Sequence, residues 1–396
     1  MKNFKKSVIA STISTLALSM AMTTQAQSFD ELIKESNLDL NFRYRVESAD
    51  VDNGTTDSAL ANTLKSRITF KSAEVAGLSL LVEGDSTLHI TDEFYDNDGD
   101  NTDNKDVVLD QETTQLNQAY LQYNGFGSTI KAGNQRINLD NQRHVGGVGF
   151  RQDEATFDAI SITNKSIDNT TIFLAAANNR NSITNTNTKE DINLLNVKYA
   201  ISKDLSASAY YYGIDDMGQE NSGVDFDTFG LRTAGSVSGI LLEAELATQD
   251  KSTATADTTS LYYNISIGQK IAGVTAKLGY EVFGSDDGEA AFATPLGTNH
   301  KFFGWTDKFL KGGGNNGIQD VNFSAVTKVS GVKLVAQLHK FDAVEGSDDL
   351  GSEMGFLVAK KFGDFGASLK VAQYFSTEET GDIDITKLWL TGTAKF

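Results

Sequence analysis

Cationic side chains recur at alternate positions early in the chain. One residue separates Arg43 from Arg45, and Lys65 and Arg67 repeat that spacing. In extended backbone, side chains two positions apart point to the same side. Each pair would therefore present two positive charges on one face, where they can attract and orient anions. These four residues are the first candidate binding residues.

Catalytic chemistry has little support in the residue pattern. The four histidines lie outside any nucleophile-elbow or zinc motif, and no Gly-rich phosphate loop with its lysine is present. The chain has 0 cysteines, which excludes thiolate nucleophiles and thiolate metal sites. We therefore predict no catalytic residue, no metal and no cofactor. A Ser/His/Asp site assembled from distant segments remains an alternative.

Acidic residues are concentrated between Asp92 and Asp110. Asp96, Asp98 and Asp100 alternate as calcium ligands do, but an asparagine follows where the loop glycine belongs and the closing glutamate is missing. We interpret the segment as a solvated acidic surface loop, with weak divalent-cation binding as the alternative.

Period-two alternation is the dominant pattern in the rest of the sequence. From Leu38 to Val46, apolar residues alternate with Asp39, Asn41, Arg43 and Arg45. Similar alternation recurs at 64–71, 78–83, 274–282 and 332–339. The pattern predicts β-strands with one apolar and one polar face, which places the candidate cations on polar faces.

The N-terminus has the features of a secretory signal. Lysines at 2, 5 and 6 precede an apolar run from Val8 to Met22, and small residues follow as far as Ala26. This run is short and polar for a membrane anchor, which favours a cleaved signal peptide. We predict a signal peptide at 1–26, a short periplasmic segment at 27–37 and a single β-domain at 38–396.

Composition restricts what that domain can be. Pro295 is the only proline, as expected of a chain made almost wholly of paired strands. No later apolar run has the length of a transmembrane helix, so a membrane-spanning form must be a closed barrel. The net charge of −19 becomes −22 once three signal-peptide lysines are removed, which argues against nucleic acid as a partner.

Connections between the expected strands alternate between short and long. Ser330-Gly331 and Ala272-Gly273 are tight turns, whereas the polar segments 91–111, 135–153, 178–191 and 284–319 are long. This is the arrangement of an outer-membrane barrel with short periplasmic turns and long extracellular loops. We predict an all-β, antiparallel transmembrane barrel of about 18 strands, with 16 as the alternative.

The C-terminal segment adds a specific feature. Between Lys387 and Phe396, Leu388, Leu390 and Ala394 share one face with the terminal aromatic residue. A final strand that ends in Phe resembles the signal recognised by the outer-membrane insertion machinery. We therefore predict that machinery as a partner, through the strand ending at Phe396.

Three stretches resemble one known family. Residues 132–159 (AGNQRINLDNQRHVGGVGFRQDEATFDA), 292–310 (FATPLGTNHKFFGWTDKFL) and 62–70 (NTLKSRITF), the last followed by Glu83, are similar to the alginate-export, porin-like outer-membrane family. The resemblance implies a monomeric barrel of 18 strands. It does not identify a substrate.

The charges also suggest a pore site. We expect the Gly-rich segment 135–153 to fold into the barrel and narrow it, which would oppose its arginines to acids across a constriction. Opposed charged rows orient polar solutes and set ion preference. Alternatively, the same arginines form structural ion pairs with nearby acids. The candidate pore-lining residues are Arg43, Arg45, Lys65, Arg67, Glu83, Arg136, Asp140, Arg143, Arg151, Asp153 and Asp158.

These observations lead to three hypotheses for function. The first is an outer-membrane channel for passive diffusion of small hydrophilic solutes, anionic or oligosaccharide-like. The second is dedicated export of a polyanionic polysaccharide such as alginate. The third is a barrel enzyme or a structural barrel with a closed lumen. Expected partners are membrane lipid, lipopolysaccharide, the insertion machinery and the solutes, with the protein itself a monomer.

Overall fold

The computed structural model describes residues 35–91, 94–96, 104–346 and 348–396. The predicted signal peptide and most of segment 27–37 lie outside this range, as does part of the acidic segment 92–110. No helix in the described ranges is long and apolar enough to cross a membrane.

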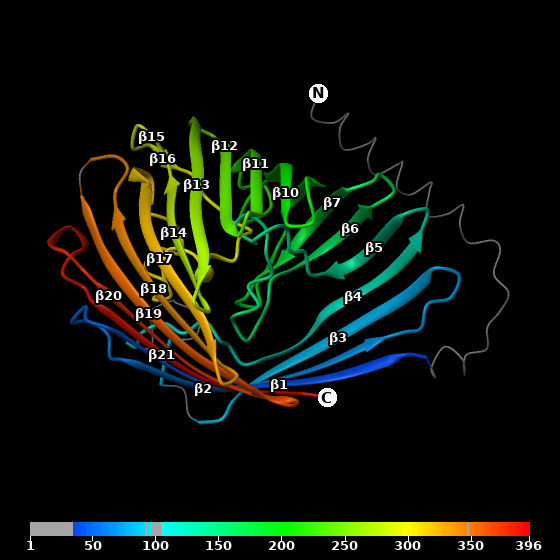
Figure 1. Cartoon of the computed structure of the whole chain (residues 1–396), viewed down its shortest axis with the longest axis horizontal. Helices are drawn as coiled ribbons and strands as arrows, with labels where there is room; N and C mark the ends of the chain where they lie inside the picture. The colour runs from blue at the N-terminus through cyan, green and yellow to red at the C-terminus, as the bar shows by residue number, and fades with distance from the viewer. Residues whose placement is uncertain (1–34, 92–93, 97–103, 347) are drawn as a thin grey trace.

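The described chain forms one antiparallel barrel (Figure 1). Its main sheet has 19 strands, of which the short β8 (Asn187–Thr188) pairs only with β7. The other 18 form the wall, which β1 and β21 close by pairing from Asn41–Lys395 to Val51–Ile385. The prediction of about 18 strands is confirmed, including the weakly patterned β5 and β7. The wall strands are β1 (Asn37–Val51), β2 (Ala59–Lys71), β3 (Leu78–His89), β4 (Thr113–Gly125), β5 (Ser128–Gln135), β6 (Thr156–Asn164), β7 (Thr170–Asn181), β9 (Asp191–Ala200), β10 (Leu205–Asp215), β11 (Asp225–Val237), β12 (Ile240–Ser252), β13 (Asp257–Ile271), β14 (Val274–Phe283), β17 (Ile318–Val329), β18 (Val332–Asp342), β19 (Asp349–Phe362), β20 (Phe365–Phe375) and β21 (Ile385–Lys395).

Residue alternation along each strand sets the two faces of the wall. On β1, Leu38 is 59% exposed, whereas Arg45 is 4% exposed and Glu47 is fully buried. Large apolar residues are exposed on most wall strands, and polar residues share the opposite face with the interior loops. A closed barrel with an outward apolar face and a polar interior is the form in which strands cross an outer membrane.

The two rims differ in their connections. On one rim the turns are tight: Ser330-Gly331 joins β17 to β18, and both residues have positive φ (49° and 81°). That backbone fits the twist of a two-residue hairpin. On the other rim the connections are longer, and they include the small elements β15 (Ser285–Asp286), β16 (Ala290–Ala291), η1 (Asn299–Lys301), η2 (Gly314–Asn316) and η3 (Glu378–Thr380). The expected short periplasmic turns and long extracellular loops are confirmed.

Two long connections occupy the interior of the barrel. We call 136–155, between β5 and β6, the first inward loop, and 284–317, between β14 and β17, the second inward loop. They pair with each other: Val145 and Leu296 form a parallel bridge, and Thr298 N–H donates to the Gln142 carbonyl at 2.9 Å. Their apolar residues join the main buried cluster with wall aromatics such as Tyr262 and Phe283.

Candidate functional site

The C-terminal part of the first inward loop, residues 149–152, is attached to β1. Arg43 donates from Nε to the Gln152 side chain at 2.8 Å and from Nη1 to the Gly149 carbonyl at 2.8 Å. Arg45 donates to the Phe150 carbonyl at 2.8 Å and stacks over the Phe150 ring. The two guanidinium groups therefore donate hydrogen bonds to backbone carbonyls of the loop and hold it against the wall.

Arg151 anchors the same part of the loop by ion pairing. Its guanidinium lies 3.0 Å from the Glu47 carboxylate of β1 and 3.3 Å from Asp307 of the second inward loop. Burial opposes its charge, but the carboxylates of Glu47, Asp110 and Asp307 raise the pKa of Arg151 above its ordinary value. Arg151 is therefore charged, and it binds both loops to the wall.

Arg143 reaches a different part of the wall. Its Nε lies 2.7 Å from Glu281 on β14, and its guanidinium stacks on the rings of Phe283, Phe302 and Phe303. Its side chain is only 1% exposed. The first inward loop thus crosses the lumen, with contacts on β14 and on β1.

At the base of this loop, charges alternate in sign. Arg136 lies 3.0 Å from Glu83 on β3 and 2.5 Å from Glu154 in the loop. Arg67 on β2 holds Asp85 through two bonds of 2.6 Å, and its Nη1 lies 3.2 Å from Glu154. Although burial opposes it, the charge of these arginines and of Lys65 lowers the pKa of Glu154 to about 2. Lys65 completes the cluster at 2.8 Å from Asp85.

Among the described residues, no ion pair joins the loop arginines Arg136, Arg143 and Arg151 to Asp140, Asp153 or Asp158. In the described ranges these aspartates accept hydrogen bonds from neutral groups. Asp140 accepts from Asn196 and Ser208, Asp153 from Gln115, and Asp158 from Asn179. The loop arginines instead pair with carboxylates of the wall, such as Glu281 and Glu47, or with Asp307 of the second inward loop. Only the expected pairing of Arg136 with Glu83 is observed.

The second inward loop has its own buried charge network. Asp307 accepts from His300 Nδ1 at 2.6 Å and from Lys387 of β21 at 3.2 Å. Burial lowers the pKa of His300 to about 3, so the ring is neutral and its Nε2 accepts from Lys370 of β20 at 2.5 Å. The rings of Phe150, Trp305 and Trp389 surround the Lys370 ammonium at 4.2–4.6 Å.

A close turn docks this loop on β19. Glu353 accepts from the Thr306 backbone at 3.1 Å and also from the Trp305 backbone. At Gly304 φ is +85°, and a Cβ there would lie 2.3 Å from the Glu353 carboxylate. Glycine is needed because any side chain would displace the carboxylate that receives the loop.

A second charged group lies on the opposite wall. Glu243 of β12 is 2.9 Å from Arg232 of β11 and 3.3 Å from Lys277 of β14. Asn141 of the first inward loop also donates to Glu243 at 2.9 Å. The Lys277 side chain is 37% exposed, so this group presents charge to water.

Exposure divides the candidate residues into two sets. Arg43, Arg67, Arg136, Asp140 and Asp158 remain partly or fully accessible. The others hold the inward loops and are buried: Arg45, Lys65, Glu83, Arg143, Arg151 and Asp153. Side chains of the first set are therefore accessible to solvent, whereas those of the second set are enclosed by the loops and the wall.

Asp153 gives a testable pH dependence. Burial raises its pKa to about 6, above the ordinary value, so the folded protein binds this proton more tightly than the unfolded chain. Its contribution to stability is therefore complete at low pH and is lost as pH rises through about 6, by about 3 kcal/mol. We expect Asp153→Asn to unfold at a higher temperature than the wild type at pH 7.5, with little difference at pH 4.

Heat-induced mobility shifts on SDS gels at the two pH values measure this effect. Asp168→Asn, in the exposed turn between β6 and β7, is the matched control. An equal difference between Asp153→Asn and wild type at both pH values would contradict the assignment.

Sequence reasoning missed several partners of the loop arginines. Glu47 shares the polar face of β1 with Arg43 and Arg45, so its alternation was a usable signal. Glu281 likewise lies on the polar face of β14. Asp307 and Glu154 had no periodic signal because they lie in loops. Within the described residues, no group of three or more His, Asp or Glu side chains is arranged to hold a metal ion.

Comparison with known proteins agrees with this architecture. No curated protein matched the sequence. The chain is similar to three solved Pseudomonas aeruginosa structures, and the match covers 92% of this chain in each case. OccD3 (OpdP) has 13% sequence identity and a TM-score of 0.67, with 92% of its own chain covered. OccK9 (OpdG) has 13% identity and a TM-score of 0.68 with 100% of its chain covered, and OccK8 (OprE) has 14% identity and a TM-score of 0.68 with 99% covered. At these identities the likeness shows a shared fold. The sequence profile described as "Alginate export" matches residues 34–374, most of the chain. This protein therefore belongs to the alginate export family.

Proposed function

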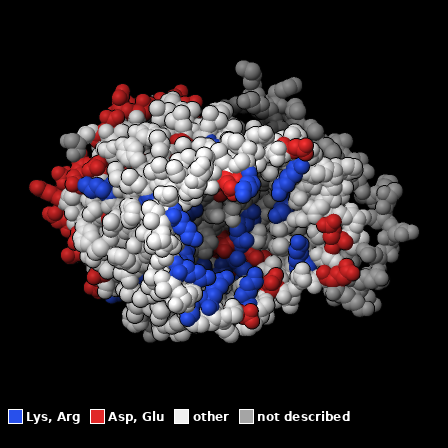
Figure 2. All heavy atoms as spheres, viewed as in Figure 1, with Lys and Arg blue, Asp and Glu red and all other residues white. Residues whose placement is uncertain are grey.

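We propose that this protein is an outer-membrane channel for passive diffusion of small hydrophilic solutes, anionic or oligosaccharide-like. The observation that carries the proposal is that charged side chains remain accessible to water beside the anchored loops. The Arg136 side chain is 25% exposed at the base of the first inward loop, and the Lys277 side chain is 37% exposed on β14. Figure 2 shows a hollow in this face of the molecule, with Lys and Arg side chains around it.

The proposed constriction has contact residues and positioning residues. Arg43, Arg67, Arg136, Asp140 and Asp158 contact the solute. The buried candidates Arg45, Lys65, Glu83, Arg143, Arg151 and Asp153 fix the width of the passage through their bonds to the inward loops. Mixed charges on facing walls orient polar solutes without binding them tightly.

The outer face of the barrel supports the proposed contacts with lipid, lipopolysaccharide and the insertion machinery. The exposed apolar outer face contacts lipid, and the long loops contact lipopolysaccharide. Phe396 is 59% exposed beside Phe42 and Phe365, where the insertion machinery can engage it. The 18-strand wall closes within one chain, which supports a monomer.

Export of a polyanionic polysaccharide such as alginate is the second candidate, and the family match favours it. It requires a continuous cationic path, whereas Arg143 and Arg151 are buried in ion pairs. We propose that the barrel has no catalytic centre. His144, His300 and His339 each pair with a carboxylate, and these pairs hold buried polar groups.

Liposome swelling tests the diffusion channel. Vesicles containing the protein are expected to swell in small sugars and small organic anions, with rates that fall steeply as solute size increases. Swelling as slow as that of protein-free vesicles for every solute would contradict the proposal. Equal swelling rates in short and long oligouronates would instead favour export of a polyanionic polysaccharide.

Ion selectivity tests the contact residues. Arg136→Gln is expected to lower the anion-to-cation permeability ratio by about twofold, because one exposed positive charge leaves the passage. Reversal potentials under a salt gradient measure the ratio. Lys189→Gln, whose side chain is 70% exposed in the loop between β7 and β9, removes the same charge outside the passage and is the control. Equal shifts in the two variants would contradict the role of Arg136.

A further inference from the structure

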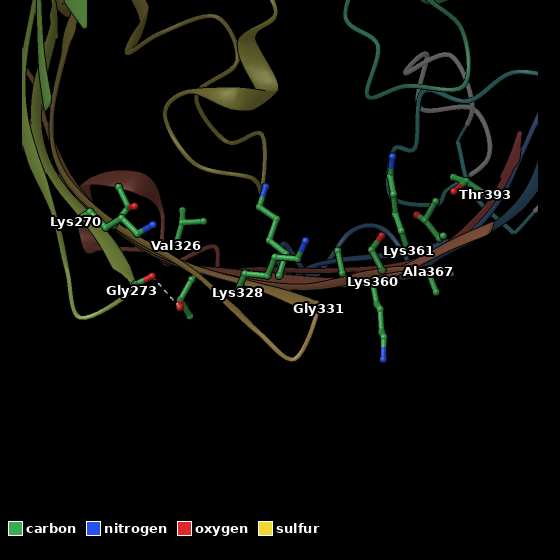
Figure 3. Close-up of a pocket in the computed structure, with 16 residues that line it drawn as sticks. Lys270, Gly273, Val326, Lys328, Gly331, Lys360, Lys361, Ala367 and Thr393 are labelled. Carbon is green, nitrogen blue, oxygen red and sulfur yellow. Dashed lines mark hydrogen bonds between the residues drawn. The ribbon is translucent and has the colours of Figure 1, made fainter. Parts of the chain in front are cut away.

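A pocket of about 710 Å³ lies along the tight-turn rim of the barrel. The ends of β13 and β17–β20, together with parts of β14 and β21, line it (Figure 3). Five lysines contribute to the lining: Lys270, Lys328, Lys333, Lys360 and Lys361. All five side chains belong to exposed residues.

Strand alternation places four of these lysines inside the barrel. Lys328 lies on the same face of β17 as Asp320, and Lys333 lies on the same face of β18 as His339, which bonds to Asp320. Lys361 shares the face of β19 with Glu353, the acceptor of the second inward loop.

Lys270 shares the face of β13 with Tyr262, whose hydroxyl donates to Glu281. Lys360 is one position out of phase with Lys361, and Figure 3 shows these two side chains on opposite sides of the wall. The four inward lysines therefore face the lumen, and Lys360 faces away from it.

These inward lysines lack counter-ions within the described chain. No Asp or Glu is among the residues that line the pocket. No ion pair is found there for Lys270, Lys328, Lys333 or Lys361, although Lys277 nearby pairs with Glu243 at 3.3 Å.

The positions of these lysines also bring like charges close together. Lys328 and Lys333 are direct cross-strand partners on the hairpin between β17 and β18. Like charges directly opposite each other destabilise a strand pair. The wall thus holds four positive charges without counter-ions in the described chain around one open pocket, an arrangement that a bound anion would stabilise.

We propose that this lysine pocket is a binding site for small multivalent anions, entered from the periplasmic side of the channel. The inference rests on the proposed channel function and adds sidedness to it. Anions arriving from the periplasm meet the pocket before the constriction, whereas those arriving from outside meet the inward loops first. Carboxylates and phosphates share the required chemistry.

Sided block of single channels tests the proposal. Citrate and tripolyphosphate serve as probes, each added to one chamber of a planar bilayer at a time. Orientation is assigned through Gln219→Cys, in the exposed loop between β10 and β11, because the natural chain has no other cysteine. Biotin on this cysteine binds streptavidin only in the chamber that faces the extracellular loops.

The variant Lys328→Gln/Lys333→Gln/Lys361→Gln removes three inward charges, and Lys360→Gln is the outward control. We expect both probes to interrupt the current more often from the periplasmic chamber than from the other. The triple variant should lower the blocking rate from that chamber by at least about tenfold, with Lys360→Gln close to wild type. The ratio of the two blocking constants assigns the preferred anion class.

Several results would overturn the site while leaving the channel intact. These are steady openings with equal block from both chambers, or block that the triple variant does not change. A third such result is a loss of block per removed charge that is the same in Lys360→Gln as in the triple variant. It would show that the block depends on the total positive charge of this rim and not on the lysine pocket. Correctly folded protein without any openings would instead reject the proposed function.

Discussion

Arg143→Met is expected to destabilise the first inward loop by about 3–5 kcal/mol and to raise single-channel conductance. The substitution leaves the Glu281 carboxylate buried on β14 without its cation, and it removes the guanidinium that stacks on three phenylalanine rings. The loop then loses its contact on that wall, so the passage beside it widens. Conductance in planar bilayers and the heat-modified gel shift measure the two effects.

A second substitution separates the loss of the Arg143–Glu281 ion pair from a general loss of stability. Arg143→Met/Glu281→Gln removes both charges, and glutamine can still accept from Tyr262, which donates to Glu281 at 3.0 Å. We expect the double variant to recover part of the stability lost in Arg143→Met, because no buried charge remains unpaired. Lys189→Met, at an exposed surface pair, should change neither property. If Arg143→Met kept wild-type stability and conductance, the claim that Arg143 holds the first inward loop on β14 would be contradicted.

Asp307→Asn is expected to have a comparable effect on the second inward loop, about 3–5 kcal/mol. Asp307 is the shared acceptor of His300, Arg151 and Lys387. Although burial opposes it, these groups hold the pKa of Asp307 well below its ordinary value, so the carboxylate is charged. Its loss leaves Arg151 and Lys387 short of a counter-ion in a buried site. We expect faster cleavage of loop 284–317 by trypsin in the folded barrel.

Two further variants make this result specific. Asp287→Asn, an exposed position in the same loop with φ of 48°, should leave the cleavage rate unchanged. Asp307→Asn/Lys387→Met removes one of the stranded cations and should restore part of the protection. If Asp307→Asn were as resistant as wild type, the buried network would not be what holds the loop.

The sequence predicted the wall well because its signal is local. Most wall strands alternate apolar and polar residues with a period of two, and burial of one face determines their register. Arg43, Arg45, Lys65 and Arg67 were therefore placed on the inner face from alternation alone. The weakly patterned β5 and β7 were harder to identify, since Gly133 interrupts one strand and several small alanines occupy the other.

The path of the inward loops was much less predictable. Arg143 could have met any acid that the folded barrel brought within reach, and Glu281 lies 138 residues further along the chain. The charge pattern suggested Asp140, Asp153 and Asp158 as acids that face the loop arginines across a constriction. The wall, however, brings Glu47 and Glu281 closer in space, and the second inward loop brings Asp307. Nothing periodic in a loop encodes such long-range contacts.

The central claim is that water and ions cross the barrel beside its two anchored inward loops. Single-channel recording of the refolded wild-type protein in a planar bilayer, under a salt gradient, tests it most directly. We predict steady openings with a reversal potential that shows selectivity between anions and cations. Correctly folded barrel that inserts but never conducts would contradict the claim, because the inward loops would then seal the lumen.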